Sequence, residues 1–387
     1  MAGNGAFGKN HLRVYRELEA AGLGVSLVAA VEPDSSRAAD AAAKYAIPVF
    51  ATVDKLLAAD LHLDAASVAV PTVHHHASAS ALLDAGLDLL VEKPLAASLA
   101  EADDLIQRAD KGKRILQVGH LERFNPAVLA IQPQLRRPMF FEAHRLSIFT
   151  PRSLDVDVVL DLMIHDLDIV LTFAASPVRE VRAVGLPILS PKVDIANVRV
   201  EFESGCVANF TASRVSTERV RKLRFFEPRQ YVSIDYARKD LLVIRIDEGA
   251  AKSQAELVAS LPPQIAALLP PGIAEGIASG KIDLSKIDPA MIAQFAAMAK
   301  IDPSVIAQFI SPAESKAGLS FSKPEVTPGE PLRLEIESFL DSVRTRREPR
   351  VTARQGRNAL ALALEIQATM AAHAHRAGLD DFFLPGV

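Results

Sequence analysis

The sequence predicts a two-domain α/β protein, in which a parallel sheet covered by helices precedes a domain with a mostly antiparallel sheet. In about the first 120 residues, short apolar runs alternate with helix-like segments, which is typical of a parallel sheet buried on both faces. After residue 121, strand-like segments follow one another with few helices between them, which indicates antiparallel pairing. The chain has 387 residues, of which 49% are hydrophobic and 23% charged, so it can bury the core that such domains need.

The first domain is predicted to comprise residues 1–121. Short apolar runs predict its strands at residues 25–31, 65–70, 87–91 and 115–118. Helices are predicted around them at residues 9–19, 35–45, 77–85 and 99–109. Asp34 or Ser35 can cap the second of these helices and Ser98 the fourth, because a side-chain oxygen there accepts a hydrogen bond from a free backbone N–H group.

The second domain is predicted to comprise residues 122–387. Its strands are expected at residues 140–148, 197–202, 206–213, 223–227 and 230–235, with helices at residues 158–173, 331–346 and 353–375. Residues 249–330 form a predicted helical insertion with an internal repeat, since residues 286–295 resemble residues 300–309. We interpret the repeat as two short amphipathic helices on the surface, with an oligomer contact or a lid as the alternative.

Composition and charge exclude several classes of function. The formal net charge is -4 and the Lys and Arg residues are scattered, so no nucleic-acid partner is expected. No apolar run approaches the roughly 18 residues that cross a bilayer, so no membrane partner is expected either. The amino terminus lacks the apolar core of a signal peptide, and the single cysteine, Cys206, fits a reducing compartment. We therefore expect a cytoplasmic protein.

A glycine-rich motif at the start of the chain predicts a dinucleotide site. Residues 3–8 (GNGAFG) match G-x-G-x-x-G, in which the glycines let a pyrophosphate approach the backbone at a helix amino terminus. Glu32 ends the next strand, where its carboxylate can bind both ribose hydroxyls and would repel a 2′-phosphate, which favours NAD over NADP. Asp34 strengthens this preference, and Arg37 weakens it slightly. The residues expected to contact NAD here are Gly3, Gly5, Ala6, Phe7, Gly8 and Glu32.

One feature of this motif departs from the usual pattern. A G-x-G-x-x-G turn should follow a strand, yet only Met1 and Ala2 precede Gly3. The central strand of the parallel sheet is therefore expected to be missing from this sequence, because its start is placed too late or the sequence is truncated. The alternative is that the chain begins here and binds the nucleotide poorly.

Two groups of polar residues predict the catalytic centre. Glu92 and Lys93 follow an apolar strand, so they are expected at the carboxyl edge of the parallel sheet, in contact with the cofactor. Asp161 and His165 are one turn apart on a mostly apolar helix, where a carboxylate can orient the imidazole ring for acid–base catalysis. A structural histidine is the alternative, and no metal is expected because no third ligand is evident. Three further residues after a strand are expected to line the cofactor cleft: Pro71, Thr72 and His75.

Taken in order, these motifs resemble the Gfo/Idh/MocA family of oxidoreductases. The resemblance covers about residues 1–248 and 331–375 and rests above all on Glu92-Lys93-Pro94 combined with Asp161 and His165. It implies a Rossmann domain followed by a mostly antiparallel α/β domain. It also implies that Lys93, Asp161 and His165 form the catalytic set and that Lys93 and His165 contact the substrate.

Residues 119–126 and 155–165 resemble most closely the branch of that family that oxidises the 3-hydroxyl of UDP-N-acetylglucosamine for lipid A amino-sugar synthesis. A UDP-sugar carries a diphosphate, which needs cationic and amide donors. The residues expected to serve it are Arg123, Asn125, Arg152 and Arg214. Another sugar, polyol or inositol dehydrogenase of the family is the enzymatic alternative. The alternative from another class is a non-catalytic nucleotide-binding regulator on the same fold.

The strand pattern of residues 197–235 predicts a homo-oligomer, either a dimer or a tetramer. Val198, Val200 and Phe202 lie on one face of their strand, while Ala208 and Phe210 lie on one face of the next. One face of the sheet can pack on the helix at residues 158–173, but the other has no evident cover. We expect this second face to be apolar and to pair with its copy, as members of the family commonly do. Helices of the repeat at residues 286–309 could cover it instead.

Overall fold

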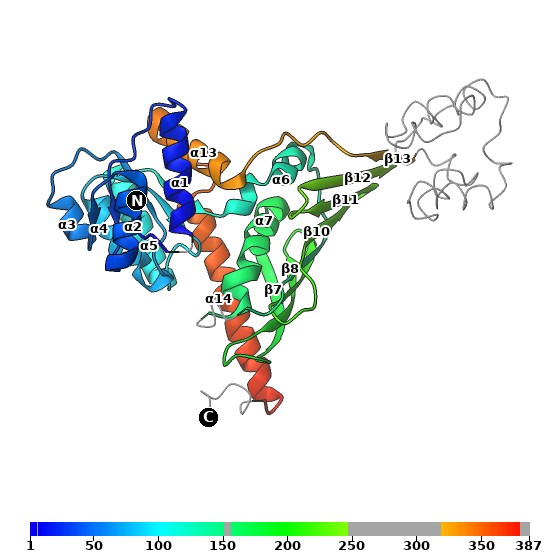
Figure 1. The fold of residues 1–387 in the computed structure, drawn as a ribbon. Coiled ribbons are helices and arrows are strands. Elements are labelled where there is room, and N and C mark those ends of the chain that lie inside the picture. Colours follow the sequence, from blue (N-terminus) through cyan, green and yellow to red (C-terminus); the bar gives the residue numbers. More distant parts are fainter. Residues whose placement is uncertain (6, 151–155, 247–318, 380–387) are drawn as a thin grey trace, which may run out of the picture. The chain divides into compact units, whose positions relative to one another are not determined.

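The computed structural model describes the chain except residue 6 and residues 151–155, 247–318 and 380–387 (Figure 1). The chain forms two compact units. The first comprises Met1–Glu227, Ser233–Leu241 and the described residues from Pro324 onward, and it contains all of the predicted site residues that are described. The second comprises Pro228–Val232 and the described residues between Leu242 and Lys323.

The amino-terminal part of the first unit contains a parallel sheet. Its strands are β1 (Ala30–Val31), β2 (Val49–Phe50), β3 (Ala65–Val68), β4 (Asp88–Glu92) and β5 (Leu116–Gly119). The pairs β1–β2, β3–β4 and β4–β5 are all parallel. Ala2 bridges Val31 on one side and Val68 on the other, so the first residues of the chain occupy the centre of the sheet.

Helices cover both faces of this sheet, as its apolar strands require. On one face lie α1 (Gly8–Ala20), α2 (Ser35–Tyr45) and α13 (Pro331–Thr345), whose apolar residues share a core with Met1. On the other face lie α3 (Val53–Leu57), α4 (His75–Asp84) and α5 (Leu99–Gly112), whose core includes Ala2. The predicted caps are confirmed, because Asp34 accepts a hydrogen bond from the N–H of Arg37, and Ser98 from that of Glu101.

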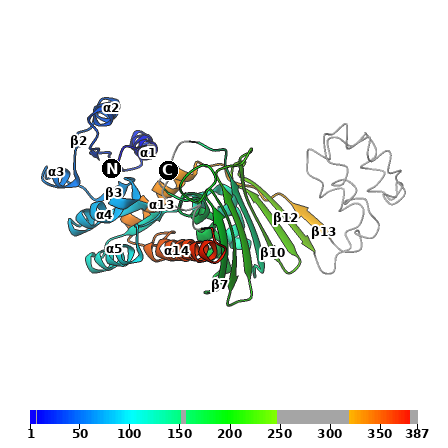
Figure 2. The same ribbon diagram turned by 90° about the horizontal axis from the view of Figure 1, so that it is seen from below.

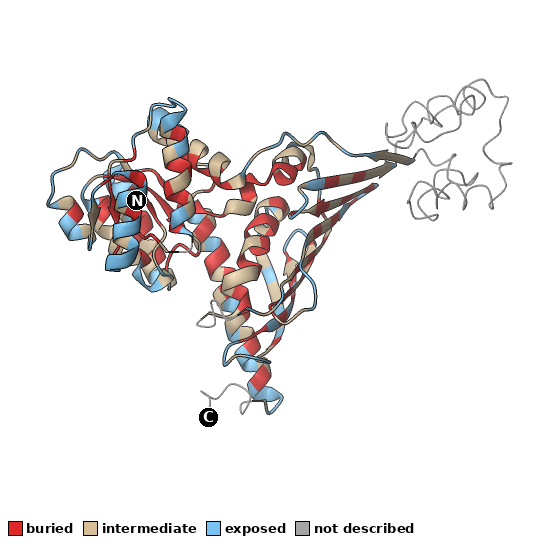
Figure 3. Ribbon diagram, viewed as in Figure 1, coloured by how far each residue is buried: buried red, intermediate tan, exposed pale blue. Residues whose placement is uncertain are grey.

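The second sheet of the first unit has the strand order β10-β6-β9-β8-β7. Its strands are β6 (Phe140–Leu146), β7 (Val178–Leu186), β8 (Ile195–Phe202), β9 (Val207–Ser213) and β10 (Val220–Glu227). Every neighbouring pair is antiparallel except β6–β9, which is parallel. Helices α7 (Ile164–Ala174) and α14 (Ala353–Arg376) cover one face of this sheet (Figures 1 and 2). In Figure 3 the buried residues gather where helices and strands face one another.

Shorter elements connect these layers. They are η1 (Thr72–His74), η2 (Leu121–Phe124), α6 (Pro126–Ile131), η3 (Gln132–Gln134) and the π-helical turn η4 (Val159–Met163). Strands β11 (Gln230–Asp235) and β12 (Asp240–Ile246) each have residues in both units. In the second unit, β12 pairs with β13 (Leu319–Ser322) in an antiparallel register. No described helix is long and apolar enough to span a membrane.

The predicted fold class is confirmed, with three differences in detail. Strands β2, β7, β12 and β13 were not predicted, and β13 lies in the stretch that we expected to be helical. The repeat at residues 286–309 lies outside the described residues, as does most of the predicted insertion. The predicted alternation of β8 and β9 is confirmed, but the open face of the sheet is polar at its centre, where Asn197, Arg199 and Thr211 lie, and not apolar as expected.

Candidate functional site

The glycine motif forms a tight turn between the centre of the parallel sheet and α1. Gly3 has φ +91°, and a Cβ atom on it would lie 2.6 Å from the carbonyl oxygen of Ala69. A Cβ atom on Gly8 would collide with the carbonyl of Gly3, whereas the space above Gly5 is open. The amino terminus of α1 has no side-chain cap and no acidic residue in its first turn. This cradle fits a pyrophosphate, because free amides and the helix dipole favour an anion there.

The loop also contains Phe7 and Ala6, which were predicted to contact the cofactor, and Asn4, which was not. Phe7 is the residue before α1, and its ring contacts His11 edge-on with the ring centroids 5.4 Å apart. Ala6, which was also predicted to contact the cofactor, lies outside the described residues. Asn4 donates its backbone N–H to a Glu32 carboxylate oxygen at 2.9 Å, so the loop is fixed to the strand beside it.

Glu32 is buried at the carboxyl end of β1. Its other carboxylate oxygen accepts hydrogen bonds from the guanidinium of Arg37 at 2.8 Å and the N–H of Asp34 at 3.0 Å. Burial acts to raise the pKa of Glu32, but Arg37 and the amides of Asp34 and Asn4 lower it overall, so the side chain is a carboxylate at neutral pH. A carboxylate has about four acceptor positions, so one remains for a ribose hydroxyl.

The segment after β3 is tied to the segment after β4 by His75. One ring nitrogen of His75 lies 2.8 Å from the carbonyl oxygen of Pro94, and the other lies 2.9 Å from that of Val70. Burial lowers the pKa of His75, which favours the neutral ring. The imidazole is thus engaged by the backbone, while Pro71 is exposed and Thr72 half-buried beside it.

Glu92, at the carboxyl end of β4, is held by a partner on α1. Its carboxylate lies 2.9 Å from Nε2 of the fully buried His11 and also accepts the N–H of Lys93 at 3.3 Å. The neighbouring strand leaves room for it, since a Cβ atom on Gly119 would lie 2.8 Å from a Glu92 carboxylate oxygen. The peptide between Lys93 and Pro94 is cis.

Lys93 reaches from the strand end to the turn that precedes α7. Its Nζ donates a hydrogen bond to the backbone carbonyl of Asp161 at 2.7 Å and lies 3.8 Å from a carboxylate oxygen of the same residue. Burial lowers the pKa of Lys93, and the carboxylates of Asp161 and Glu92 offset this only in part. The lysine is therefore anchored and more easily deprotonated than a lysine in water.

His165 lies close to Lys93, at the start of α7. Burial, followed by the charges of Lys93 and Arg145, holds the pKa of His165 well below its usual value, so the ring is neutral at pH 7. Its Nδ1 is buried and has no hydrogen-bond partner among the described residues. A neutral imidazole can accept a proton, and an anchored lysine can hold an oxygen atom, so the pair can act on a hydroxyl group.

The predicted link between Asp161 and His165 is not present as a hydrogen bond within the described part of the chain. The polar contact of the Asp161 side chain is with Lys93. The reason is local, because Asp161 lies in the π-helical turn η4 and His165 in the α-helix that follows it. A π turn changes the register, so an i, i+4 spacing no longer places the two side chains one above the other.

The structure brings two further residues to this centre that we did not predict. His120 follows β5, and both of its ring nitrogens are buried without a partner among the described residues. Burial lowers the pKa of His120. The charge of Asp168 acts to raise this pKa, and the charges of Arg123 and Lys93 act to lower it. Arg145, on β6, binds the Asp166 carboxylate at 2.7 and 3.0 Å. The position of His120 directly after an apolar strand, like that of Lys93, was the available signal.

The predicted substrate residues are largely engaged within the protein. Arg123 is 2% exposed and lies 3.4 Å from a carboxylate oxygen of Asp168. Arg214 lies 2.7 Å from a carboxylate oxygen of Asp194. These internal ion pairs argue against the prediction that the two arginines bind a diphosphate.

Asn125 and Arg152 complete the predicted substrate set. The Asn125 side chain accepts the N–H of Ala127 at 3.2 Å and caps α6. It also donates to the carbonyl of Tyr236 at 3.1 Å. Arg152 lies outside the described residues. No group of three or more His, Cys, Asp or Glu residues within the described ranges could hold a metal ion.

Two family models match the chain. Residues 1–120 match the model described as an oxidoreductase family with an NAD-binding Rossmann fold. Residues 127–229 match that of the GFO/IDH/MocA C-terminal domain.

Several relatives of the chain are named dehydrogenases. The UDP-N-acetylglucosamine 3-dehydrogenase of Acidithiobacillus ferrooxidans is 37% identical over 248 residues, which cover 64% of this chain and 76% of that protein. The inositol 2-dehydrogenase of Acidothermus cellulolyticus is 31% identical over 192 residues, which cover 48% and 55%. These names confirm the enzyme interpretation over the non-catalytic regulator.

Solved structures have the same fold over almost the whole chain. That of the Acidithiobacillus ferrooxidans UDP-N-acetylglucosamine 3-dehydrogenase has a TM-score of 0.73 and 30% identity, with 96% of each chain covered. An Agrobacterium radiobacter oxidoreductase in complex with NAD+, L-tartaric acid and magnesium has a TM-score of 0.68 and covers 96% of this chain. At 13% identity it supports the fold alone. The protein belongs to the Gfo/Idh/MocA family of oxidoreductases.

Proposed function

We propose that the protein oxidises the 3-hydroxyl group of UDP-N-acetylglucosamine with NAD+ as the hydride acceptor. The observation that carries this proposal is the anchored Lys93 at the carboxyl end of β4. Its Nζ lies 2.7 Å from the backbone carbonyl oxygen of Asp161. The relative at 37% identity is a UDP-N-acetylglucosamine 3-dehydrogenase, which supports this choice of sugar. A lysine and a neutral histidine beside a dinucleotide cradle are the groups that an alcohol oxidation needs.

His165, Lys93 and Asp161 have different roles in this proposed reaction. His165, which is neutral at pH 7, takes the proton of the reacting hydroxyl, directly or through Lys93. Lys93 holds the reacting oxygen, and Asp161 holds Lys93 in place. Bound NAD+ supplies the acceptor for the hydride that leaves the same carbon, so the alcohol becomes a ketone. In this assignment Asp161 orients the lysine and not the histidine.

The cradle and Glu32 support NAD over NADP. The open space above Gly5 and the uncapped amino terminus of α1 would hold the pyrophosphate. Glu32 would accept a ribose hydroxyl and repel a 2′-phosphate. Arg37 is already paired with Glu32, which reduces its attraction for such a phosphate. The single cysteine, Cys206, also fits a reducing compartment, and we propose that the protein is cytoplasmic.

A polyol or inositol substrate is the second candidate, and one observation favours it. The arginines expected to bind the diphosphate, Arg123 and Arg214, are neutralised by internal carboxylates. A ligand without charge needs no such cations. Inositol 2-dehydrogenases are also among the relatives of this chain.

The test is NAD+ reduction with three substrates: UDP-N-acetylglucosamine, free N-acetylglucosamine and myo-inositol. Reduction with the UDP-sugar alone supports the proposal, whereas equal rates with the free sugar or a preference for myo-inositol would overturn the choice of substrate.

Lys93→Met and His165→Asn should each lower kcat by about 10²- to 10⁴-fold. Lys55→Met, at an exposed position on α3, is the control and should keep full activity. Full activity in both site variants would contradict the mechanism.

A further inference from the structure

The proposed substrate carries a diphosphate, which needs a cationic side chain to bind it. The arginines expected from the sequence, Arg123 and Arg214, are paired with carboxylates inside the protein. A cation that serves the substrate must instead be open to solvent, have no carboxylate partner, and lie close to Lys93 and His165.

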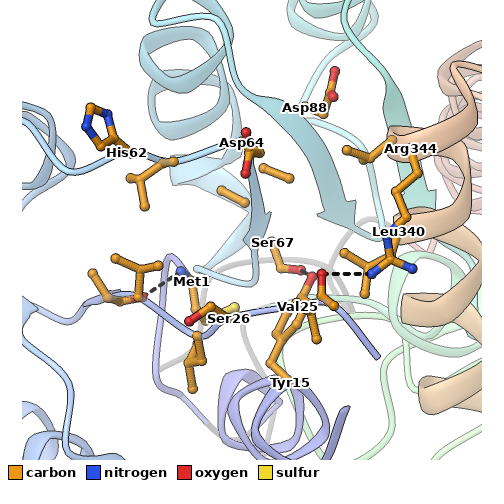
Figure 4. A pocket seen from close by; sticks show the side chains of 18 of the residues that line it. Met1, Tyr15, Val25, Ser26, His62, Asp64, Ser67, Asp88, Leu340 and Arg344 are labelled. Carbon is orange, nitrogen blue, oxygen red and sulfur yellow. Dashed lines mark hydrogen bonds between the residues drawn. The ribbon is translucent and has the colours of Figure 1, made fainter. Parts of the chain in front are cut away.

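The cavity of ≈ 610 Å³ drawn in Figure 4 does not supply this cation. Arg344, which lines it, donates hydrogen bonds to two backbone carbonyls at 2.6 and 3.1 Å. Arg346, which also lines it, is paired with Asp88. Neither Lys93 nor His165 lines the cavity, so it is not part of the catalytic centre.

The cations around His165 include one that is free. Burial is the main cause of the low pKa of His165, and the charges of Lys93, Arg145 and Arg221 act in the same direction. Lys93 lies 3.8 Å from a carboxylate oxygen, and Arg145 binds two carboxylates. The side chain of Arg221 forms no hydrogen bond or ion pair with any described residue. Of these three cations, Arg221 is therefore the one available to a ligand.

Strand β10 places Arg221 on the side of the sheet that carries the catalytic helix. Arg221 pairs in register with Arg145 on β6, and residues directly opposite each other in a sheet lie on the same face. Leu223 and Phe225 follow at alternate positions and are fully buried. The ring of Phe225 contacts that of Phe173 on α7, with the centroids 5.9 Å apart. Arg221 shares this face but is exposed, so its guanidinium is open to solvent.

We propose that Arg221 binds a phosphate group of the substrate, so that the site prefers a phosphorylated sugar over an uncharged polyol. The inference rests on the proposed function and names the residue that selects its substrate. A guanidinium presents five N–H donors in a planar fork that matches phosphate oxygens. Because the charge of Arg221 reaches His165, one sugar nucleotide can contact both side chains.

The test measures binding of UDP and of uridine by calorimetry, with NAD+ at saturation so that the cofactor cradle is filled. The unaltered protein should bind UDP more tightly than uridine. Arg221→Met should weaken UDP binding by about tenfold or more and leave uridine binding unchanged, because charge-assisted hydrogen bonds to the phosphates are lost. Arg221→Lys keeps the charge and should restore part of the affinity. Arg224→Met, on the opposite face of the same strand, is the control.

The reaction supplies a second measurement. Arg221→Met should raise KM for UDP-N-acetylglucosamine by about tenfold or more with little change in kcat, and should leave KM for free N-acetylglucosamine unchanged.

The binding results decide the proposal separately from the reaction. Equal affinity of the unaltered protein for UDP and uridine would overturn the role of Arg221, as would UDP binding that Arg221→Met leaves unchanged. An equal loss in Arg224→Met would also overturn it, because that side chain lies on the other face. UDP binding that depends on Arg221, without NAD+ reduction by UDP-N-acetylglucosamine, would contradict the proposed reaction and support the phosphate site.

Discussion

At the scale of single residues, Glu335 is the most unusual buried group in the described structure. It lies on α13, is 0% exposed, and neither carboxylate oxygen has a hydrogen-bond partner among the described residues. Burial, followed by the charges of Glu92 and Asp168, raises the pKa of Glu335 well above its usual value. The folded protein therefore holds the Glu335 proton to a higher pH than the unfolded chain does.

This protonation makes the stability of the protein depend on pH. The unfolded chain releases the Glu335 proton near pH 4.5, whereas the folded chain keeps it. As pH rises above that value, the free energy of unfolding falls by up to roughly 1.4 kcal/mol per pH unit from this group. Glu335→Gln should remove the loss, and so stabilise the protein at about pH 8 with little change at about pH 4.5. Urea unfolding at both pH values, with the exposed Glu348→Gln as control, checks this. Equal effects at the two pH values would contradict it.

Glu32 governs the choice of cofactor if the proposed function holds. Glu32→Gln keeps the shape of the side chain but removes its charge, which weakens a ribose hydrogen bond and frees Arg37 to meet a 2′-phosphate. The ratio of NADP+ to NAD+ dissociation constants should fall by about fivefold, since a charged hydrogen bond exceeds a neutral one by roughly 1 kcal/mol. Calorimetric titration with both nucleotides measures this ratio. An unchanged ratio would show that Glu32 does not select the cofactor.

At the scale of elements, the ends of β4 and β5 depend on each other. Glu92 pairs in register with Gly119, and the missing Cβ atom of Gly119 leaves the space that the Glu92 carboxylate needs. Gly119→Ala should displace this carboxylate from His11 and lower the free energy of unfolding by about 1–3 kcal/mol. Thermal unfolding measures the loss. Gly112→Ala is the matched control, because its new Cβ atom meets only the flexible side chain of Arg114. Equal stability of the two variants would contradict the role of Gly119.

The sequence predicts elements well where one local signal decides them. The helix at residues 35–45 was predicted with its bounds, because Asp34 caps it and its composition favours a helix. The strand Val178–Leu186 was missed, since most of its side chains are only partly buried and it lacks a clear apolar alternation. The π turn Val159–Met163 could not be predicted from helical periodicity. The predicted contact of Asp161 with His165 was therefore wrong.

Long-range ion pairs limited the prediction of the site in the same way. Arg123 meets Asp168, which is 45 residues away in the sequence, and Arg214 meets Asp194, which is 20 residues away. From the sequence, a single arginine near a predicted cleft is taken to be free to bind a ligand. Its carboxylate partner is known only once the fold brings distant residues together. The strand-end rule did predict the position of Lys93 directly after β4, because it depends on the order of strands and helices and not on individual side-chain partners.

At the scale of the whole molecule, the open face of the second sheet is the surface to consider for assembly. No described helix covers it, and its central side chains are polar: Arg182, Asn197, Arg199, Asn209 and Thr211. Interfaces between proteins that also exist apart are about as polar as the rest of their surfaces, so this composition is compatible with pairing. The homo-oligomer stays a prediction, and the predicted contact between copies now consists of polar side chains on this face.

A pair formed through this face would be two-fold symmetric, so each side chain near the axis would meet its own copy or a close neighbour. Arg199 lies near the centre, 3.4 Å from Glu201 and within hydrogen-bond distance of Asn209, and is half-exposed. Arg199→Glu would place two new carboxylates, together with those of Glu201, in the contact, where like charges repel. Light scattering should give a dimer or larger mass for the unaltered chain and a smaller mass for this variant. Arg354→Glu, at an exposed site on α14, is the control and should leave the mass unchanged. A monomer mass for the unaltered chain would contradict the prediction.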